Sequence, residues 1–416
     1  MTREIWLNLA IALVITFYVL QIGEFIFNHP ICKNNIIDYC LYWSSGNLSK
    51  IYGFKELYNI EIVRKIQLEI FSIDPILSNN FPGYPLGYLP IFILPFTAFS
   101  IFNLPLSYFL WTLINFIVLI LYLRFFTKKL FGYPLPNKLL LFFMLSLPIF
   151  INFFEGQVNI FLLICVGEFF RALLSEKPFI AGLWLGGWLL KFVLLILIIP
   201  FLLIKGKKNT LLGFFTSSFI ILLTSISLVG IEGMLALKNL LLDSASGIPL
   251  NNVWAMINWR MIGWQVSTLS SSTFGWVITI IGTLVTIGLT FIFFRKWDKG
   301  DPIKTAIMLL GIFSATCVVS WHSHLHTSII LIPLLAYLMM KNIFNKNLFI
   351  AWIFIPVMVL LIGMIIAVFL QLGNLSRLSI QLLSLARGLP GLIFCLLILN
   401  WSVNHIDYEE HEINNP

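Results

Sequence analysis

The sequence predicts an all-α integral membrane protein, a single bundle of about twelve transmembrane helices that covers residues 1–416. Of these residues, 59% are hydrophobic and 11% are charged, and the mean hydropathy is +0.95. Soluble domains carry about 25% charged residues. Apolar runs long enough to cross roughly 30 Å of hydrocarbon recur from Ile5 to Asn400, which leaves no room for a soluble domain of useful size.

Five short segments rich in Lys and Arg interrupt the apolar runs and indicate the cytoplasmic side, because cytoplasmic loops carry an excess of these residues. The formal net charge of +8 is therefore spread over loops rather than along one basic strip. This argues against nucleic acid as a partner and leaves membrane lipids as the surroundings. The segments are RFFTKKLFGYPLPNK (124–138), RALLSEKP (171–178), KGKKN (205–209), RKWDKGDPIK (295–304) and KNIFNKN (341–347).

Alternation across the membrane from these segments gives the predicted spans. The first run is too long for the apolar region of a signal peptide and has no small-residue cleavage site, so we expect a retained span. Both termini then lie in the cytoplasm of a multi-pass plasma membrane protein. Residues 28–105 and 231–272 form outer loops, the first carrying interfacial helices, and residues 401–416 form a cytoplasmic tail. The spans lie at about 5–27, 106–124, 138–154, 158–171, 179–190, 192–204, 210–230, 273–294, 303–320, 326–340, 348–370 and 381–400.

Two apolar runs do not fit simple spans. The run 178–204 is longer than one span but must begin and end inside, so we interpret it as two short helices that meet near Lys191 at the outer side. The Pro-containing run 87–102 would break the alternation if it crossed the membrane, so we expect a dipping or interfacial element. Short helices of this kind need shielding by neighbouring helices.

The first outer loop contains a segment with helical periodicity. In KELYNIEIVRKIQLEIF, residues 55–71, apolar side chains recur every three or four positions, and the charged side chains lie mostly elsewhere around the helix. This pattern is typical of a helix on the membrane surface, and a packed helix of a small soluble subdomain is the alternative. The same loop contains Cys32 and Cys40, which either pair or remain free thiols, the simpler interpretation.

Polar residues outside the basic segments gather at the predicted outer ends of the spans. Because these loops then converge on one face of the membrane, we treat their polar side chains as one candidate site. The residues are Asp38 in NNIIDYCLYW, Glu155, Gln157 and Asn159 in FFEGQVN, Lys191, Asn258 and Arg260 in MINWRMIGW, and His322, His324 and His326 in SWHSHLH.

Each of these residues also has a purely structural interpretation. A carboxylate in an outer loop is usually solvated, Lys191 near a helix end can extend its amine to the interface, and Gln157 can cap the following helix. Three histidines suggest a metal site, but in a helix their spacing places only His322 and His326 on one face. With no obvious carboxylate ligand nearby, a metal site is the minor interpretation.

Taken together, one acid, several cations and an apolar surround fit the transfer of a sugar from a glycosyl-phosphate donor. The leaving phosphate is already anionic, so its departure is helped by Lys, Arg and His rather than by a proton donor. The acceptor hydroxyl needs one general base, for which a lone carboxylate suffices. A glycoside hydrolase would instead need two carboxyl groups flanking the bond.

Several stretches, in their order along the chain, resemble the motifs of a known family. They correspond to an acid followed by aromatic residues, a Tyr-Pro-Pro-rich segment, a Gly-Gln-x-Asn motif, an Ala-Gly-x-x-x-Gly then Lys pattern, an Asn-containing outer loop and a His-bearing turn. The sequence resembles the GT-C superfamily of membrane glycosyltransferases and, more narrowly, glycosyltransferase family 87, the polyprenol-phosphate-mannose-dependent α-1,2-mannosyltransferase type. The stretches are DYCLYW (38–43), FPGYPLGYLPIFILPF (81–96), EGQVNIFLL (155–163), PFIAGLWLGGWLLKFVLLILIIPFLL (178–203), MINWRMIGW (256–264) and 321–326.

The resemblance implies a GT-C-like fold and transfer of a hexose, mannose in the family, from a polyprenyl-phosphate donor to a glycolipid or glycan on the outer face. It implies that Asp38 is the general base for attack on C1 with inversion. The donor would bind near Lys191, Arg260 and the histidines, with no metal or other cofactor. Leu86 stands where the family has a second proline after Tyr84, which bears on acceptor recognition. The predicted substrate-binding set is completed by Gln157, Asn159, Asn258 and Tyr84.

Two other functions remain open at this point. A lipid-linked oligosaccharide polymerase or ligase shares the many-helix plan and outer-face chemistry but is expected to use a lipid-pyrophosphate donor. A lipid-sugar transporter tends to have charged residues near the midplane and repeated halves, whereas here the polar residues lie at the outer ends. A purely structural subunit would leave the joint pattern of Asp38, Lys191, Arg260 and His322 unexplained.

Overall fold

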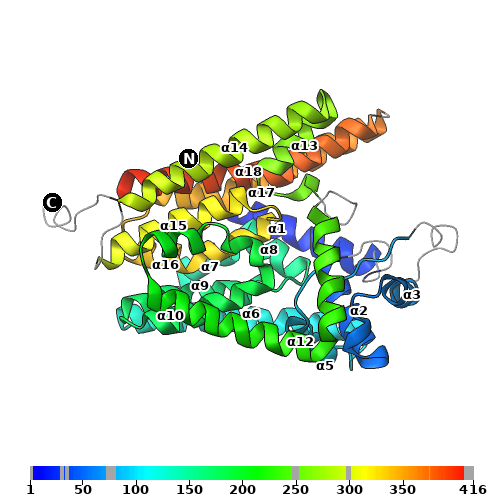
Figure 1. Ribbon diagram of the computed structural model, residues 1–416. Helices are drawn as coiled ribbons and strands as arrows, with labels where there is room; N and C mark the ends of the chain where they lie inside the picture. Colours follow the sequence, from blue (N-terminus) through cyan, green and yellow to red (C-terminus); the bar gives the residue numbers. More distant parts are fainter. Residues whose placement is uncertain are drawn as a thin grey trace, which may run out of the picture.

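The computed structural model describes residues 3–28, 32, 37–71, 81–245, 253–296, 301–373 and 375–406. Within these ranges the secondary structure is helical, apart from one isolated antiparallel bridge between Met256 and His324. The long helices run side by side, and α2, α3 and α5 gather at one end of the bundle (Figure 1). The prediction of an all-helical membrane protein is confirmed.

The helices have the following bounds: α1 Arg3–Asn28, α2 Asp38–Tyr52, η1 Phe54–Glu56, α3 Ile60–Phe71, η2 Pro90–Ile93, α5 Leu94–Phe99, α6 Leu104–Phe131, α7 Asn137–Met144, α8 Leu147–Phe154, α9 Asn159–Leu174, α10 Pro178–Gly186, η3 Gly187–Leu195, α11 Ile198–Ile204, α12 Lys208–Ala245, η4 Val253–Ala255, α13 Trp259–Leu269, α14 Ser272–Arg295, α15 Pro302–Val319, η5 Leu325–Leu331, α16 Ile332–Met340, α17 Lys346–Leu372 and α18 Ser376–His405.

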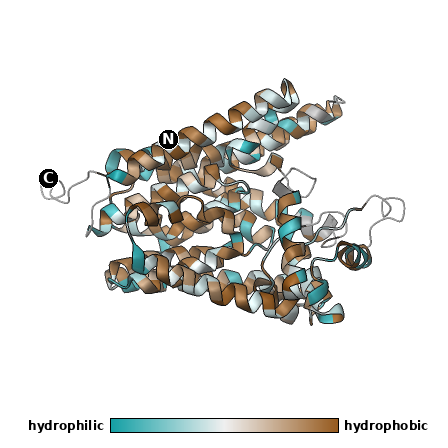
Figure 2. Cartoon of the chain, viewed as in Figure 1, coloured by the Kyte–Doolittle hydropathy of each residue, from teal (hydrophilic) through white to brown (hydrophobic). Residues whose placement is uncertain are grey.

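Eight helices in the described part of the chain are long and apolar enough to cross a membrane, and the bent pair α7–α8 raises the number to nine. The structure therefore supports a multi-pass membrane protein without confirming twelve spans. Many large hydrophobic side chains of the long helices are exposed, as lipid contact requires. Hydrophobic residues predominate along the long helices, and hydrophilic residues gather mainly toward two ends of the bundle (Figure 2). The helix α15 is apolar on all sides and lies buried among its neighbours, which is typical of a central helix.

Breaks or kinks occur in three apolar regions of the chain. The predicted span 138–154 is divided into α7 and α8, bent by 61°, because Pro148 in the first turn of α8 starts a new helix more readily than it continues one. The run 178–204 does break at Lys191, where the backbone leaves helical geometry (φ −132°, ψ 67°). The helix α12 continues through a kink at Gly230, so residues 231–245 of the predicted second outer loop are helical.

The predicted first outer loop contains the expected helices, but α3 is packed against protein. Its apolar residues Val63 and Ile66 are buried, and Gln67 is tied to Ser44 of α2 at 3.3 Å. The packed-helix alternative therefore describes this face better than the membrane-surface one. The short elements η2 and α5 occupy the middle of the predicted interfacial run 87–102.

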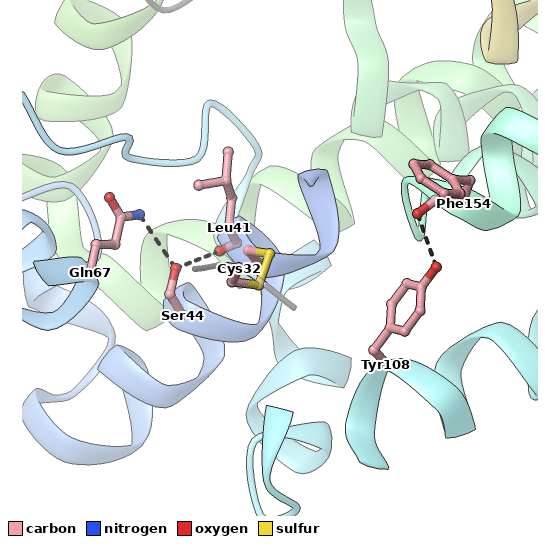
Figure 3. The surroundings of a disulfide bond; sticks show 7 residues. Cys32, Leu41, Ser44, Gln67, Tyr108 and Phe154 are labelled. Atoms are coloured by element: carbon pink, nitrogen blue, oxygen red, sulfur yellow. Dashed lines mark hydrogen bonds between the residues drawn. A yellow bond between two sulfur atoms is a disulfide. The ribbon is translucent and has the colours of Figure 1, made fainter. Parts of the chain in front are cut away.

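A disulfide joins Cys32 to Cys40 at the first turns of α2 (Figure 3). The interpretation of these residues as free thiols is therefore wrong. Sequence spacing does not reveal the pairing, which depends on the fold of α2 bringing the two Cα atoms to 5.9 Å. Asp38 lies between the two bonded cysteines in the sequence, two residues before Cys40.

Candidate active site

Asp38 is the first residue of α2 and lies beside the turn that joins α8 to α9. The Tyr39 amide donates to the Glu155 carbonyl at 3.0 Å, which holds α2 against this turn. Gly156 has φ 65°, and a Cβ placed on it would lie 2.6 Å from the Tyr39 Cβ. Only glycine therefore permits both the backbone conformation of the turn and its close approach to α2.

Gln157 connects the acid to a lysine. Its amide nitrogen donates to the Asp38 carboxylate, while its carbonyl oxygen accepts from Lys191 Nζ at 3.1 Å and from the Tyr42 hydroxyl at 3.1 Å. Tyr42 in turn lies 3.2 Å from the Tyr88 hydroxyl. The side chain of Gln157 is buried and makes these contacts rather than capping α9.

Lys191 is buried in the bundle at the break in η3. Its side chain is directed to Gln157, and the residue is only 8% exposed, so it does not extend to the interface. A lysine inside an apolar span is costly unless it faces polar partners. Here the break in the helix places the amine beside the Asp38 network.

The environment of Asp38 raises its pKa to about 7. Burial is the largest cause, and the negative charge of Glu155 adds to it. Lys191, the hydrogen bond from Gln157, and Arg387 act in the opposite direction. The carboxyl group is therefore close to half ionised at neutral pH, which suits a general base.

Glu155 forms an ion pair with Arg387 of α18 at 2.9 Å, and Arg387 also lies over the Trp254 ring at 5.6 Å. The prediction did not include Arg387. Arg387 lies within the predicted apolar span 381–400. A charged residue in an apolar run is also the pattern that singled out Lys191, so the sequence alone could have indicated Arg387. Its partner lies 232 residues away in the chain, and only the fold reveals it.

The segment that carries the histidines runs beside the segment before α13. The Ile257 amide donates to the Ser323 carbonyl at 2.9 Å. Asn258 caps α13 by accepting from the Met261 amide, and its nitrogen donates to the Ser320 carbonyl at 2.8 Å. These bonds show that Asn258 holds the two segments together, which we call its bracing role.

Arg260 lies in the first turn of α13, with its guanidinium over the Trp321 ring at 4.2 Å. Trp321 stacks on Trp276 with centroids 5.9 Å apart. The Nη1 atom of Arg260 is buried without a hydrogen-bond partner. A buried cationic N–H group in this condition favours an anionic ligand.

The three histidine rings form a row, with centroids 4.7 Å apart from His322 to His324 and 5.4 Å apart from His324 to His326. Burial and the charges of Lys191 and Arg260 lower the pKa of His322 to about 3. Burial likewise lowers the pKa of His324. At neutral pH these two rings are therefore neutral hydrogen-bonding groups rather than cations.

Asn159 and Tyr84 occupy supporting positions. Asn159 donates to the Asn152 side chain at 3.1 Å and, at 3.4 Å, to the His326 carbonyl, so it ties α8 and α9 to η5. Tyr84 is held through its backbone by Gln67 of α3. From the same predicted segment, Tyr88 rather than Tyr84 reaches the Asp38 network.

The model of glycosyltransferase family 87 matches residues 86–320, more than half of the chain. The chain belongs to glycosyltransferase family 87. No curated protein and no solved structure gives a significant match. The resemblance found in the motifs is thereby confirmed, and the protein is a membrane glycosyltransferase that acts on a sugar donor and an acceptor.

The family match covers part of the candidate site. Gln157, Lys191 and Arg260 lie inside the matched range, whereas Asp38 precedes it and the histidines follow it. The structure brings all of these into one region of this family 87 protein. Among the residues that the structure describes, no group of three His, Cys, Asp or Glu side chains has a metal-binding arrangement.

Proposed function

We propose that this family 87 glycosyltransferase moves a hexose, with mannose as the first candidate, from a polyprenyl-phosphate donor to a hydroxyl group of a glycolipid or glycan. The observation that carries the proposal is the hydrogen-bonded chain from Asp38 through Gln157 to Lys191. It joins one base to one cation in a buried setting. The charge of Arg260, whose Nη1 atom has no hydrogen-bond partner, acts together with that of Lys191 on His322. We place the reaction at the outer face of the plasma membrane, with both termini in the cytoplasm.

In the proposed reaction Asp38 accepts the proton of the acceptor hydroxyl while the acceptor oxygen attacks C1 of the sugar. The bond from C1 to the phosphate oxygen breaks, and the lipid phosphate leaves with the electron pair. Attack opposite to the leaving group inverts the configuration at C1. Because the second carboxylate, Glu155, is paired with Arg387, we assign the single base role to Asp38.

The cationic side of the site receives the phosphate. Lys191 and Arg260 supply positive charge, and His322, whose lowered pKa keeps it neutral, supplies hydrogen bonds. Charge-assisted hydrogen bonds of this kind stabilise the charge that develops on the leaving oxygen. The proposed reaction uses no metal or other cofactor, and we expect EDTA to leave transfer by the wild-type protein unchanged.

The test is sugar transfer by the purified full chain in lipid, with labelled polyprenyl-phosphate-mannose as donor and a crude glycolipid extract as acceptor. We expect the wild-type protein to transfer label, and Asp38→Asn to retain donor binding while losing turnover. Turnover of Asp38→Asn at the wild-type rate would remove Asp38 as the base. Transfer only from a lipid-pyrophosphate donor would instead favour a polymerase or ligase.

Lys191→Met tests the donor site separately. Loss of one charged hydrogen bond costs about 1.5–3 kcal/mol, which corresponds to roughly a tenfold to hundredfold weaker donor affinity. The measurement is the donor KM together with equilibrium donor binding. An unchanged affinity would place the phosphate away from Lys191.

A further inference from the structure

Three buried nitrogen atoms, at the start of α13 and in the histidine segment, have no hydrogen-bond partner among the described residues. They are Arg260 Nη1, Trp321 Nε1 and His322 Nδ1. Arg260 and His322 belong to the predicted site residues, whereas Trp321 does not. A buried N–H group without a partner is rare in folded proteins, because it has lost its hydrogen bonds to water and gained none. The indole N–H of Trp321 therefore calls for a ligand that supplies the missing acceptor.

The three side chains form one cluster. The Arg260 guanidinium lies over the Trp321 ring at 4.2 Å, and His322 follows Trp321 in the chain. Burial is the main cause of the low pKa of His322, and the charges of Lys191 and Arg260 add to it. Both cations therefore lie near this imidazole. A ligand that Arg260 holds is thus in the neighbourhood of the Trp321 indole as well.

The orientation of the Trp321 ring is fixed by its contacts. Besides the guanidinium of Arg260, the Trp276 ring of α14 stacks on it, with centroids 5.9 Å apart and an angle of 18° between the planes. The Trp321 carbonyl accepts from the Asn258 side chain at 3.4 Å, which holds the backbone. Turning the indole would break the two ring contacts. The N–H group is therefore held in one direction before any ligand binds, which lowers the entropy cost of binding.

The chemistry of the cluster indicates what kind of acceptor it binds. Arginine and tryptophan side chains carry hydrogen-bond donors and no acceptor. No carboxylate of the described residues forms an ion pair with Arg260. A phosphodiester carries one negative charge and several oxygen acceptors but no donor, so it matches both the charge and the donors of the cluster. A sugar hydroxyl would leave the charge of Arg260 unbalanced.

We propose that the Trp321 indole N–H donates a hydrogen bond to the phosphate of the lipid-linked sugar donor, beside Arg260, which makes Trp321 a further donor-binding residue of this glycosyltransferase. This inference rests on the proposed function, because it takes the anion to be the donor phosphate. The bond is kept when the C1–O bond breaks and the phosphate leaves with the electron pair. It then helps to stabilise the charge on the leaving group.

Two tryptophan variants of the full chain separate this role from a structural one. Trp321→Phe keeps an aromatic face for Arg260 and removes the N–H group, so polyprenyl phosphate should bind about tenfold to a hundredfold more weakly. Trp259, the neighbour of Arg260, already donates its indole N–H to Thr286 at 2.9 Å. Trp259→Phe should therefore lower the melting temperature and leave the affinity unchanged. Wild-type affinity in Trp321→Phe, or equal losses in the two variants, would overturn the inference.

Nuclear magnetic resonance observes the N–H group directly. The chain contains 13 tryptophans, and selective nitrogen-15 labelling in phosphatidylcholine nanodiscs gives an indole signal for each. The signal that is missing from Trp321→Phe should move downfield when polyprenyl phosphate is added, because a hydrogen bond to a charged oxygen is short and strong. The signal that is missing from Trp259→Phe should stay in place. Phosphatidylglycerol should not move the Trp321 signal, and an equal shift with this lipid would overturn the inference.

Phosphate binding and sugar transfer fail separately. A Trp321 signal that moves with polyprenyl phosphate, in a protein that transfers no sugar from any donor, would refute the proposed function and leave a phosphate-binding site. Sugar transfer by a wild-type protein whose Trp321 signal does not move would refute this inference and leave the proposed function intact.

Discussion

Opposing effects act on the ionisation of the Asp38 carboxyl group. Its place in the first turn of α2 favours a negative charge, because the N-terminal end of a helix is electropositive. Burial and the neighbouring Glu155 disfavour that charge, and the balance raises the pKa to about 7. Gln157 and Lys191 keep the group ionisable at neutral pH, where a base must both accept and release a proton.

The pH dependence of kcat/KM tests this balance. Protonated Asp38 accepts no proton, so the rate should rise with pH and reach half of its plateau near pH 7. Glu155→Gln removes the charge that raises the pKa and leaves Arg387 unbalanced, so the half-point should move to lower pH. Arg387→Met should move it to higher pH.

A second glutamate provides the matched control for this profile. Glu168 of α9 is also buried and also paired with an arginine, Arg171, at 2.5 Å. Because Glu168 does not act on Asp38, Glu168→Gln should leave the half-point in place even if it lowers the amount of folded protein. Equal shifts in Glu168→Gln and Glu155→Gln would assign the profile to a group other than Asp38.

Among the elements, the turn between α8 and α9 determines where the base lies. Gly156 and Gly206 both have positive φ, 65° and 60°, but a Cβ on Gly206 would meet nothing within 4 Å. Alanine at either position suffers the same backbone strain, and only Gly156→Ala also presses against Tyr39. We expect Gly156→Ala to lose about 1–3 kcal/mol more stability than Gly206→Ala and to lower kcat, since it displaces α2.

Thermal unfolding and single-turnover transfer measure these two effects. Gly206→Ala should keep the wild-type kcat. If both variants have the same melting temperature and the same kcat, the close packing of the turn against α2 does not position Asp38.

The disulfide at the start of α2 gives a second prediction at this scale. Closing a loop of this size stabilises a protein by roughly 2–3 kcal/mol. The double variant Cys32→Ser, Cys40→Ser should therefore unfold at lower temperature and have a lower kcat, because the first turn of α2 is held less firmly. Dithiothreitol should reproduce the effect in the wild type and add nothing in the double variant, and an additional loss in that variant would point to another thiol.

Across the whole molecule, polar groups from distant parts of the chain meet in one region of an apolar bundle. The elements that supply them are α2, the turn before α9, η3, the segment before α13, the first turn of α13, the histidine segment and α18. The surrounding helices present apolar faces to lipid, which holds the polar groups in a setting of low dielectric. Packing of the bundle, rather than any local motif, brings the candidate site together.

The orientation of the bundle is tested by cysteine labelling in intact cells. Lys55, in the predicted outer loop, and Lys177, in a predicted cytoplasmic segment, are both exposed. A membrane-impermeant maleimide should label Lys55→Cys from outside and Lys177→Cys only after permeabilisation. Background should be low because Cys32 and Cys40 are paired and the other three cysteines are buried. Labelling of both from the same side would refute the predicted topology.

Composition and apolar run length by themselves determined the class of the protein. In a bilayer each backbone polar group must be satisfied within its own helix, so local hydropathy is enough to predict an all-helical membrane protein. Isolated charged or polar residues in such a sequence are costly, which is why Asp38, Gln157, Lys191 and Arg260 could be singled out, and the order of the motifs indicated the family.

The tertiary structure decided how those residues are paired. The partner of Glu155, the neutral state of His322 and the bracing role of Asn258 all depend on segments distant in the chain. The pairing of Cys32 with Cys40 is local, but it depends on how the chain folds at the start of α2. Local hydropathy also could not predict the number of spans, because short and bent helices are stabilised by their neighbours rather than by their own length. Hydrophobicity is read from local sequence, whereas contacts between polar groups are set by the packing of the helices that carry them.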